Sequence, residues 1–170
     1  MSTSTMARSS AAIPVNTAKV SGRRELHFSK IAEIQTDAEN LARQNVQQLG
    51  NWTPGTALAH LARTMKMSLD GADFRPPFMI RLFAPLIKKR LLRGPMKPGF
   101  KLPGKAAEEL IPKTSVTTER GLSELRSVID RLNREPNRAP SPVFGQMTRE
   151  EWDQLHLRHA ELHLSFFVPS

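Results

Sequence analysis

The pattern of apolar and polar positions near the C-terminus predicts a long amphipathic helix. Residues 148–167 read TREEWDQLHLRHAELHLSFF, and Thr148 with Glu151 has the spacing of a capping box at a helix start. Nothing in the sequence breaks this helix before Pro169. At about 100° per residue, one face is apolar at its ends and carries imidazoles in its middle. This face comprises Trp152, Leu155, His156, His159, His163 and Phe166.

Two histidines on this face have the spacing of a metal-ligand pair. His159 and His163 are four residues apart, so both rings can reach one point beside the helix. Helices present pairs of metal ligands in this way. A core histidine bonded to a carbonyl or carboxylate would produce the same pattern. The spacing alone therefore leaves a metal site and a packed core open.

Three earlier stretches have the same helical periodicity. We expect helices at about residues 29–49, 53–70 and 117–132, each beginning at a Ser or Thr that can cap the first turn. For the first of them the cap is Ser29 and the stop is Gly50. No strand-like alternation of apolar and polar residues is found in the sequence. The pattern therefore predicts an all-α fold with four main helices.

The segment between the second and third of these main helices is long and basic. Residues 76–93, PPFMIRLFAPLIKKRLLR, are expected to form an extra helix that bends at Pro85. Residues 94–116 contain four Pro and three Gly, which predicts a long connection. The mixture of apolar and basic residues resembles an amphipathic surface or partner-binding segment. It also fits an ordinary crossover in which long basic side chains cover apolar neighbours.

Composition narrows the classes of protein. The 170 residues suit a single domain, which we place at residues 22–170 after a disordered N-terminal arm at residues 1–21 that is rich in Ser, Thr and Ala. The absence of Cys excludes disulfides, thiolate zinc sites and a cysteine nucleophile. No apolar run approaches the roughly 20 residues of a membrane span. We expect a cytoplasmic protein without a membrane partner.

The positive charge belongs to one segment of the chain. The net charge is +9, and residues 75–105 contain nine Lys and Arg but no Asp or Glu. The rest of the chain has 25 − 9 = 16 basic and 16 acidic side chains, so it is balanced. Proteins that follow nucleic acid more often spread their basic residues along a face with stacking aromatics. We therefore expect no specific nucleic-acid binding.

A fourth histidine lies on the helix predicted at residues 53–70. Leu58, Leu61, Ala62, Met65 and Leu69 form the apolar stripe of that helix. His60 lies about 100° from Leu61, at the edge of the stripe. Periodicity alone therefore favours a half-exposed histidine, although such a position also suits a ligand in a pocket that opens to solvent.

Four segments of the sequence together resemble a known superfamily. They are VNTAKVSGRRELHF at 15–28, GNWTPGTALAHLA at 50–62, SPVFGQMTREEW at 141–152 and HLRHAELHLSFF at 156–167. In their order and spacing they resemble the DinB-like (damage-inducible) superfamily, and are most similar to an uncharacterised bacterial branch of it. The resemblance covers nearly the whole chain from residue 15. The sequence departs from many relatives in having one imidazole within Glu161-Leu162-His163, and Ser141-Pro142 where some relatives have His-Pro.

The resemblance implies a fold and a site. The fold would be an up-down-down-up four-helix bundle with a long basic crossover that contains an extra helix. One divalent metal would be bound by His60, His159 and His163, with His156 as a candidate accessory residue. Zn²⁺ or Ni²⁺ is the most plausible metal, because imidazole ligands suit both. Three histidines with an open fourth position are typical of a catalytic site.

Two functions of different classes follow. The first is a metal-dependent enzyme that acts on a small molecule by a thiol-linked transfer or a hydrolysis, with a low-molecular-weight thiol as a candidate substrate. The alternative is a non-catalytic helical bundle that binds a partner or an anionic ligand through the basic segment at residues 75–105. Pairing through bundle faces into a homodimer is common in such folds.

Overall fold

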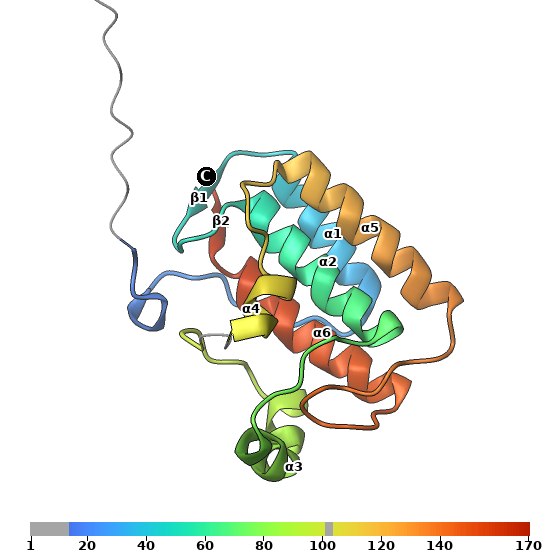
Figure 1. The fold of residues 1–170 in the computed structure, drawn as a ribbon. Coiled ribbons are helices and arrows are strands. Elements are labelled where there is room, and N and C mark those ends of the chain that lie inside the picture. Colours follow the sequence, from blue (N-terminus) through green and yellow to red (C-terminus); the bar gives the residue numbers. More distant parts are fainter. Residues whose placement is uncertain (1–13, 101–103) are drawn as a thin grey trace, which may run out of the picture.

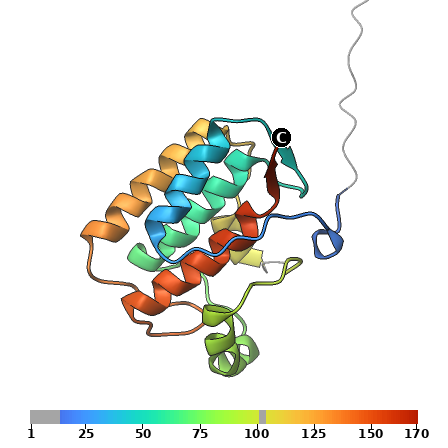
Figure 2. The same cartoon turned by 180° about the vertical axis from the view of Figure 1, so that it is seen from behind.

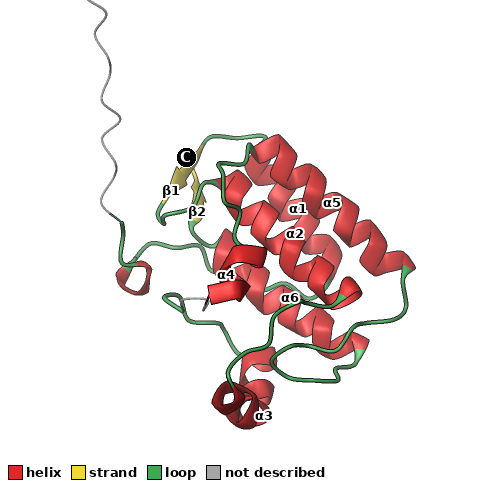
Figure 3. Ribbon diagram, viewed as in Figure 1, coloured by secondary structure: helices red, strands yellow, loops and turns green. Residues whose placement is uncertain are grey.

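Helices make up most of the structure, a computed structural model that describes residues 14–100 and 104–170 (Figure 1). In chain order the helices of this described part are α1 (Ile31–Ala42), α2 (Pro54–Asp70), α3 (Phe78–Arg93), α4 (Gly104–Leu110), α5 (Thr118–Arg134) and α6 (Arg149–Leu164). A short 3-10 helix, η1 (Thr17–Lys19), precedes them. Two short strands, β1 (Val46–Gln48) and β2 (Phe167–Pro169), form a small sheet (Figure 3). The mostly helical structure agrees with the predicted all-α class.

The main core is shared by α1, α2, α5 and α6. α1 and α2 contact each other and both α5 and α6, and the helices lie side by side in both ribbon views (Figures 1 and 2). α1, α2 and α5 each contribute the apolar stripe that their periodicity predicts. α6 instead buries Leu157, Ala160 and Leu164 in this core, and none of these lies on the face predicted for it. The buried members include Ile34, Ala38, Leu41, Leu58, Leu61, Met65, Leu122, Leu125, Ile129, Leu132, Leu157, Ala160 and Leu164.

Two glycines let α2 and α5 approach closely near their N-terminal ends. A Cβ atom at Gly121 would lie 2.5 Å from the carbonyl oxygen of Gly55 and 3.1 Å from Cβ of Leu58. A Cβ atom at Gly55 would overlap the carbonyl oxygen of Val116. Neither position can therefore carry a side chain unless the helices move apart. The crossing fixes α2, and with it His60, against the rest of the core.

Helix starts follow the local chemistry of the sequence. The Thr53 hydroxyl accepts a hydrogen bond from the Thr56 amide at the start of α2, where Pro54 occupies the first helical position. The Thr117 hydroxyl caps α5 in the same way. At α6, Thr148 and Glu151 form both hydrogen bonds of the capping box. These three predicted starts are confirmed.

The first helix differs from its prediction at both ends. Ser29 is not its cap; Lys30 occupies that position and makes no capping hydrogen bond through its side chain. The Glu33 carboxylate instead accepts a hydrogen bond from the Ser29 amide at 2.7 Å. The helix ends at Ala42 rather than near Leu49, because the following residues extend into β1.

The strands were not predicted, and they also shorten the last helix. β1 and β2 pair antiparallel, with Val46 opposite Pro169 and Gln48 opposite Phe167. The chain therefore leaves α6 after Leu164, rather than continuing to Pro169 as predicted. Three-residue strands are too short to show alternation, and their partners are far apart in the sequence. Their hydrogen bonds fasten the C-terminus to the segment between α1 and α2.

The N-terminal segment crosses α6 before it enters α1 (Figure 2). The Arg24 guanidinium binds the Asp37 carboxylate with two contacts of 2.7 Å and donates to the Leu164 carbonyl at 3.0 Å. The Phe28 amide donates to the buried Glu161 carboxylate at 2.6 Å. Residues 1–13 of the predicted arm lie outside the described residues. Its remaining part contains η1 and two hydrogen bonds between Val15 and Asn51.

The long connection between α2 and α5 carries two helices. α3 agrees with the helix expected at residues 76–93, and it stands apart from the main core at one edge of the molecule (Figure 1). α4 was not predicted; it lies within the Pro- and Gly-containing residues 94–116 and contacts α2. No helix in the described parts of the chain is long and apolar enough to cross a membrane.

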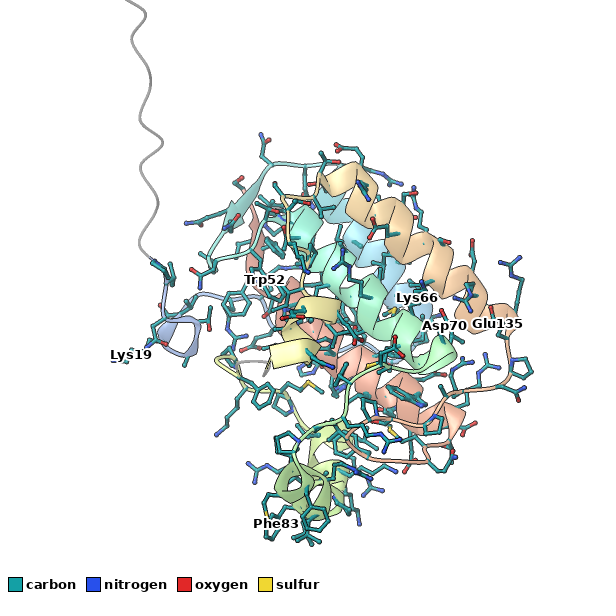
Figure 4. The ribbon with its side chains drawn as sticks, in the orientation of Figure 1. Lys19, Trp52, Lys66, Asp70, Phe83 and Glu135 are labelled. Atoms are coloured by element: carbon teal, nitrogen blue, oxygen red, sulfur yellow. The ribbon has the colours of Figure 1, made fainter. Side chains whose placement is uncertain are left out.

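An ion-pair network joins the C-terminal ends of α2 and α5. Arg131 contacts Asp70 on α2 and Glu135 after α5, each at 2.7 Å. Figure 4 shows Lys66, Asp70 and Glu135 at this end of the helices. The side chains of these pairs are partly exposed to solvent, so each pair contributes only about 0–1 kcal/mol to folding.

Candidate metal centre

Three histidines from two core helices meet at one point. His60 lies in the second turn of α2, and His159 and His163 lie one turn apart on α6. Nε2 of His159 is 3.3 Å from Nε2 of His60 and 3.0 Å from Nε2 of His163. One ligand atom from each of the three lies within 4.8 Å of the other two. The structure thus brings together the three residues that the resemblance singled out.

These separations fit the donor set of a divalent cation. Ligands at about 2.0–2.1 Å from a tetrahedral centre lie about 3.3 Å from one another. The two Nε2–Nε2 distances, 3.3 and 3.0 Å, are close to that value. His60 is buried, while His159 and His163 keep partial exposure. A bound ion could therefore be held by protein on one side and remain accessible on the other.

The neighbours of two rings direct their lone pairs towards this point. Nδ1 of His60 lies 2.8 Å from the Leu110 carbonyl oxygen. Because a carbonyl oxygen can only accept a hydrogen bond, Nδ1 carries the proton of the neutral ring, and Nε2 carries its lone pair. The Thr64 hydroxyl donates to the Leu61 carbonyl at 2.9 Å, so it can only accept from Nδ1 of His159, 3.4 Å away. The His159 Nε2 then also carries a lone pair. A carbonyl and a hydroxyl behind the imidazoles are the supporting contacts typical of metal-bound histidines.

Aromatic packing orients the other faces of the rings. The indole of Trp52, which precedes α2 and is labelled in Figure 4, stacks on His163 with ring centres 5.1 Å apart and planes 5° from parallel. The same indole meets the edge of His60 at 4.8 Å. Trp52 therefore limits the rotation of one imidazole from each helix.

Burial keeps the imidazoles neutral. Loss of hydration lowers the pKa of His60 to about 4, although the hydrogen bond to the Leu110 carbonyl partly opposes this effect. Burial also lowers the pKa of His163 to about 3. The pKa of His159 falls well below its ordinary value, first through burial and then through repulsion by the neighbouring imidazoles. Each ring is therefore uncharged near neutral pH and keeps a lone pair on one nitrogen, so the three rings could hold a metal ion.

The comparisons with known proteins assign the chain to a family. Residues 20–170 match the family described as "Protein of unknown function (DUF1569)". The chain belongs to DUF1569. The comparison with curated proteins and the comparison with solved structures each found no match. The chemistry of its own residues is therefore what indicates a function for this DUF1569 chain.

His156 occupies a separate, apolar environment in this DUF1569 chain. Its side chain is 2% exposed, and Nε2 lies 3.0 Å from the Ser68 hydroxyl. Its ring lies nearly parallel to the buried indole of Trp152 at 5.5 Å. Burial lowers the pKa of His156 to about 3. His156 is not part of the group that could hold a metal, and its contacts are those of a core residue.

The structure corrects one interpretation of the sequence and adds three neighbours. His60 is 2% exposed, so its assignment as half-exposed from periodicity was wrong, because α4 packs on α2 and its last residue, Leu110, contacts His60. Sequence reasoning also missed Trp52, Thr64 and Leu110. Thr64 is one turn after His60, a signal that was present in the sequence. Leu110 acts through its backbone carbonyl, for which no residue type gives a signal.

Proposed function

We propose that this DUF1569 protein is a metal-dependent enzyme of the DinB-like type that acts on a small molecule. Its site would bind one divalent metal through Nε2 of His60, His159 and His163. The observation that carries the proposal is the approach of two imidazole lone pairs to 3.3 Å, which is unfavourable for neutral rings alone and favourable around a cation. Zn²⁺ and Ni²⁺ suit an all-imidazole donor set best.

The proposal also covers the topology of the fold, the cellular compartment and the class of substrate. The shared core of α1, α2, α5 and α6 supports a DinB-like, up-down-down-up four-helix bundle. We further propose that the protein acts in the cytoplasm on a small molecule, with a low-molecular-weight thiol as the leading candidate. Homodimerisation would be compatible with this arrangement.

The residues of this chain would provide a rigid and partly enclosed site. Leu110 and Thr64 hold His60 and His159 in the tautomers that leave Nε2 free, and Trp52 covers one face of His163. A divalent metal bound there would supply Lewis acidity, which polarises a carbonyl or lowers the pKa of a water or thiol. The partial exposure of His159 and His163 leaves a side from which a small molecule can approach. These features favour thiol-linked transfer or hydrolysis as the reaction class.

Metal uptake by untagged protein tests the first part of the proposal. We expect elemental analysis and calorimetric titration to give one Zn²⁺ or Ni²⁺ per chain, and His159→Ala to abolish this stoichiometric binding. His27→Ala is the matched control, because His27 is exposed and outside the group. Wild-type protein that takes up no Zn²⁺, Ni²⁺, Mn²⁺ or Fe²⁺ tighter than the micromolar range would overturn the proposal.

A thiol titration tests the second part. Co²⁺-loaded protein should show a new near-ultraviolet absorption band when cysteine is added, if a thiol sulfur reaches the metal. His159→Ala protein mixed with the same Co²⁺ and cysteine is the control for complexes formed in solution. Stoichiometric metal without any spectral response to thiols would remove the thiol from the proposal and leave hydrolysis as the reaction to assay.

A further inference from the structure

Helix α3 exposes most of the large apolar side chains found on the described surface. Of nine exposed large hydrophobic residues, seven lie between Phe78 and Ile87. Phe78 is 70% exposed and Leu86 is 77% exposed. Figure 4 shows Phe83 at the outer edge of α3, away from the main core. A contiguous exposed apolar surface of this kind marks an interaction site.

The opposite side of α3 fixes the helix to the body of the protein. Ala84 and Leu92 are buried, and the Lys88 ammonium lies 2.7 Å from the Glu151 carboxylate of α6. These three residues are four apart and so form one stripe. Leu92 packs with Trp152 and Met147, which anchors the C-terminal end of the helix. The apolar face thus points outward because the other face is already occupied.

Basic residues continue the outward face towards the C-terminal end of α3. Met79, Leu82, Phe83 and Leu86 lie on the outward side, and Arg90 and Arg93 follow them at helical spacing. Leu86, Lys89, Arg90, Arg93 and Gly94 line a shallow hollow at that end. Residues 75–105 contain no Asp or Glu. The surface therefore presents apolar groups next to a positively charged hollow.

We propose that α3 docks this protein on an anionic lipid surface. The apolar residues of its first turns would enter the boundary between headgroups and acyl chains, while Lys89, Arg90 and Arg93 bind lipid phosphates. The helix projects from the molecule and so suits a surface that it can enter. A second copy of the chain suits it poorly, because two-fold pairing would bring two sets of basic residues together. A soluble polyanion would leave the apolar face unexplained.

The inference changes one expectation from the sequence and is independent of the proposed metal site. The lack of a membrane-spanning run led to the expectation of no membrane partner. A helix that lies in the interface needs no such run, because it buries only one face. None of the three histidines at residues 60, 159 and 163 belongs to α3.

Vesicle flotation with full-length protein tests the proposal. We expect binding to phosphatidylcholine vesicles that contain about a third phosphatidylglycerol, and little binding to pure phosphatidylcholine. Replacing Lys89, Arg90 and Arg93 with Gln should weaken binding about a hundredfold. The matched control replaces Lys30, Lys113 and Arg134 with Gln. These residues are exposed and lie outside α3, and their replacement removes the same amount of charge.

Separate variants test the contribution of the exposed apolar residues of α3 to vesicle binding. Leu86→Glu should weaken vesicle binding tenfold or more, to about the same extent as losing one buried leucine. It should leave the melting temperature unchanged, because Leu86 is 77% exposed. Val15→Glu is the control, since Val15 is exposed outside α3. The chain has no Cys, so a polarity-sensitive dye on Met79→Cys reports entry of that position into lipid.

Three outcomes would overturn the proposal. One is equal binding of wild type and Leu86→Glu to vesicles. Another is a wild-type dimer that Leu86→Glu dissociates, with no vesicle binding by either protein, which would identify a second copy as the occupant. The third is retention on heparin without vesicle binding, which would identify a soluble polyanion.

Discussion

Two tryptophan–histidine stacks in this protein should have different consequences when they are removed. Trp52 packs on His163 and His60, both members of the proposed metal site. Trp152 packs on His156 in the core, and its indole N–H donates to the Ala139 carbonyl at 3.1 Å. One stack therefore holds candidate ligands in place, and the other contributes to the stability of the fold.

We predict that Trp52→Ala weakens metal affinity about 10- to 100-fold, as the loss of supporting contacts around ligands typically does. Trp52→Phe should restore most of the affinity, because it keeps an aromatic face for His163. Trp152→Ala should instead lower the free energy of unfolding by about 3–5 kcal/mol and leave metal affinity nearly unchanged. Calorimetric titration and denaturant unfolding of the same three variants separate the two effects. Similar losses of affinity in Trp52→Ala and Trp152→Ala would contradict the assignment.

The sequence predicted part of the site at the level of residues. The spacing of His159 and His163 gave the pair on α6, because residues four apart on a helix converge regardless of tertiary structure. His60 came only from the resemblance, since its burial depends on a segment about 50 residues later that supplies the Leu110 carbonyl. The stacking role of Trp52 likewise depends on how α2 and α6 are placed against each other. Contacts of this kind have no local signature.

At the scale of elements, the approach of α2 and α5 makes a specific prediction. Gly121→Ala should lower the free energy of unfolding by about 1–3 kcal/mol, because its Cβ atom would lie 2.5 Å from the Gly55 carbonyl oxygen. The matched control is Ser123→Ala, an exposed position on the same helix, which should change stability by at most about 0.5 kcal/mol. Urea unfolding measures both. If Gly121→Ala were as stable as wild type, the two helices could not be packed as closely as the structure has them.

The helices that could be predicted are those whose ends have local causes. Thr53, Thr117 and Thr148 each cap a helix through their own side chains, and all three starts were found from the sequence. The end of α1 and the end of α6 were missed together. Both depend on the pairing of β1 with β2, which joins residues more than 100 positions apart. A single sequence does not reveal that pairing.

At the scale of the whole molecule, α6 links the two regions with a proposed function. Its N-terminal half holds α3 through Glu151 and Trp152. Its C-terminal half carries His159 and His163. α3 lies at one edge of the molecule, whereas the candidate metal centre lies between core helices. Lipid docking through α3 would therefore leave the histidines free to act on a small molecule.

The buried histidines also make stability depend on pH across the molecule. Above pH 6.5 the imidazole of His156 is neutral in both the folded and the unfolded chain, so it contributes no pH dependence. As pH falls below 6.5, the unfolded chain binds a proton, while folded His156 stays neutral down to a pKa of about 3. Unfolding is therefore favoured as the pH falls, by about 1.4 kcal/mol per pH unit for each such histidine. His60, with its pKa lowered to about 4, acts in the same direction.

We predict that metal-free protein loses stability steeply between pH 6.5 and 5, and that His156→Gln makes this slope shallower by about 1 kcal/mol per pH unit on average. His27→Gln, at an exposed position, is the control and should keep the wild-type slope. Some carboxylates have a lowered pKa in the folded protein, as Glu151 does beside Lys88. Their protonation reduces stability mainly as the pH falls below the ordinary carboxyl pKa of 4.5, which lies below the range from pH 6.5 to 5. Denaturant unfolding in a chelator at several pH values gives the slopes. Equal slopes for wild type and His156→Gln would mean that His156 is already a charged imidazolium in the folded protein. Its place between Trp152 and Ser68 does not allow this charge.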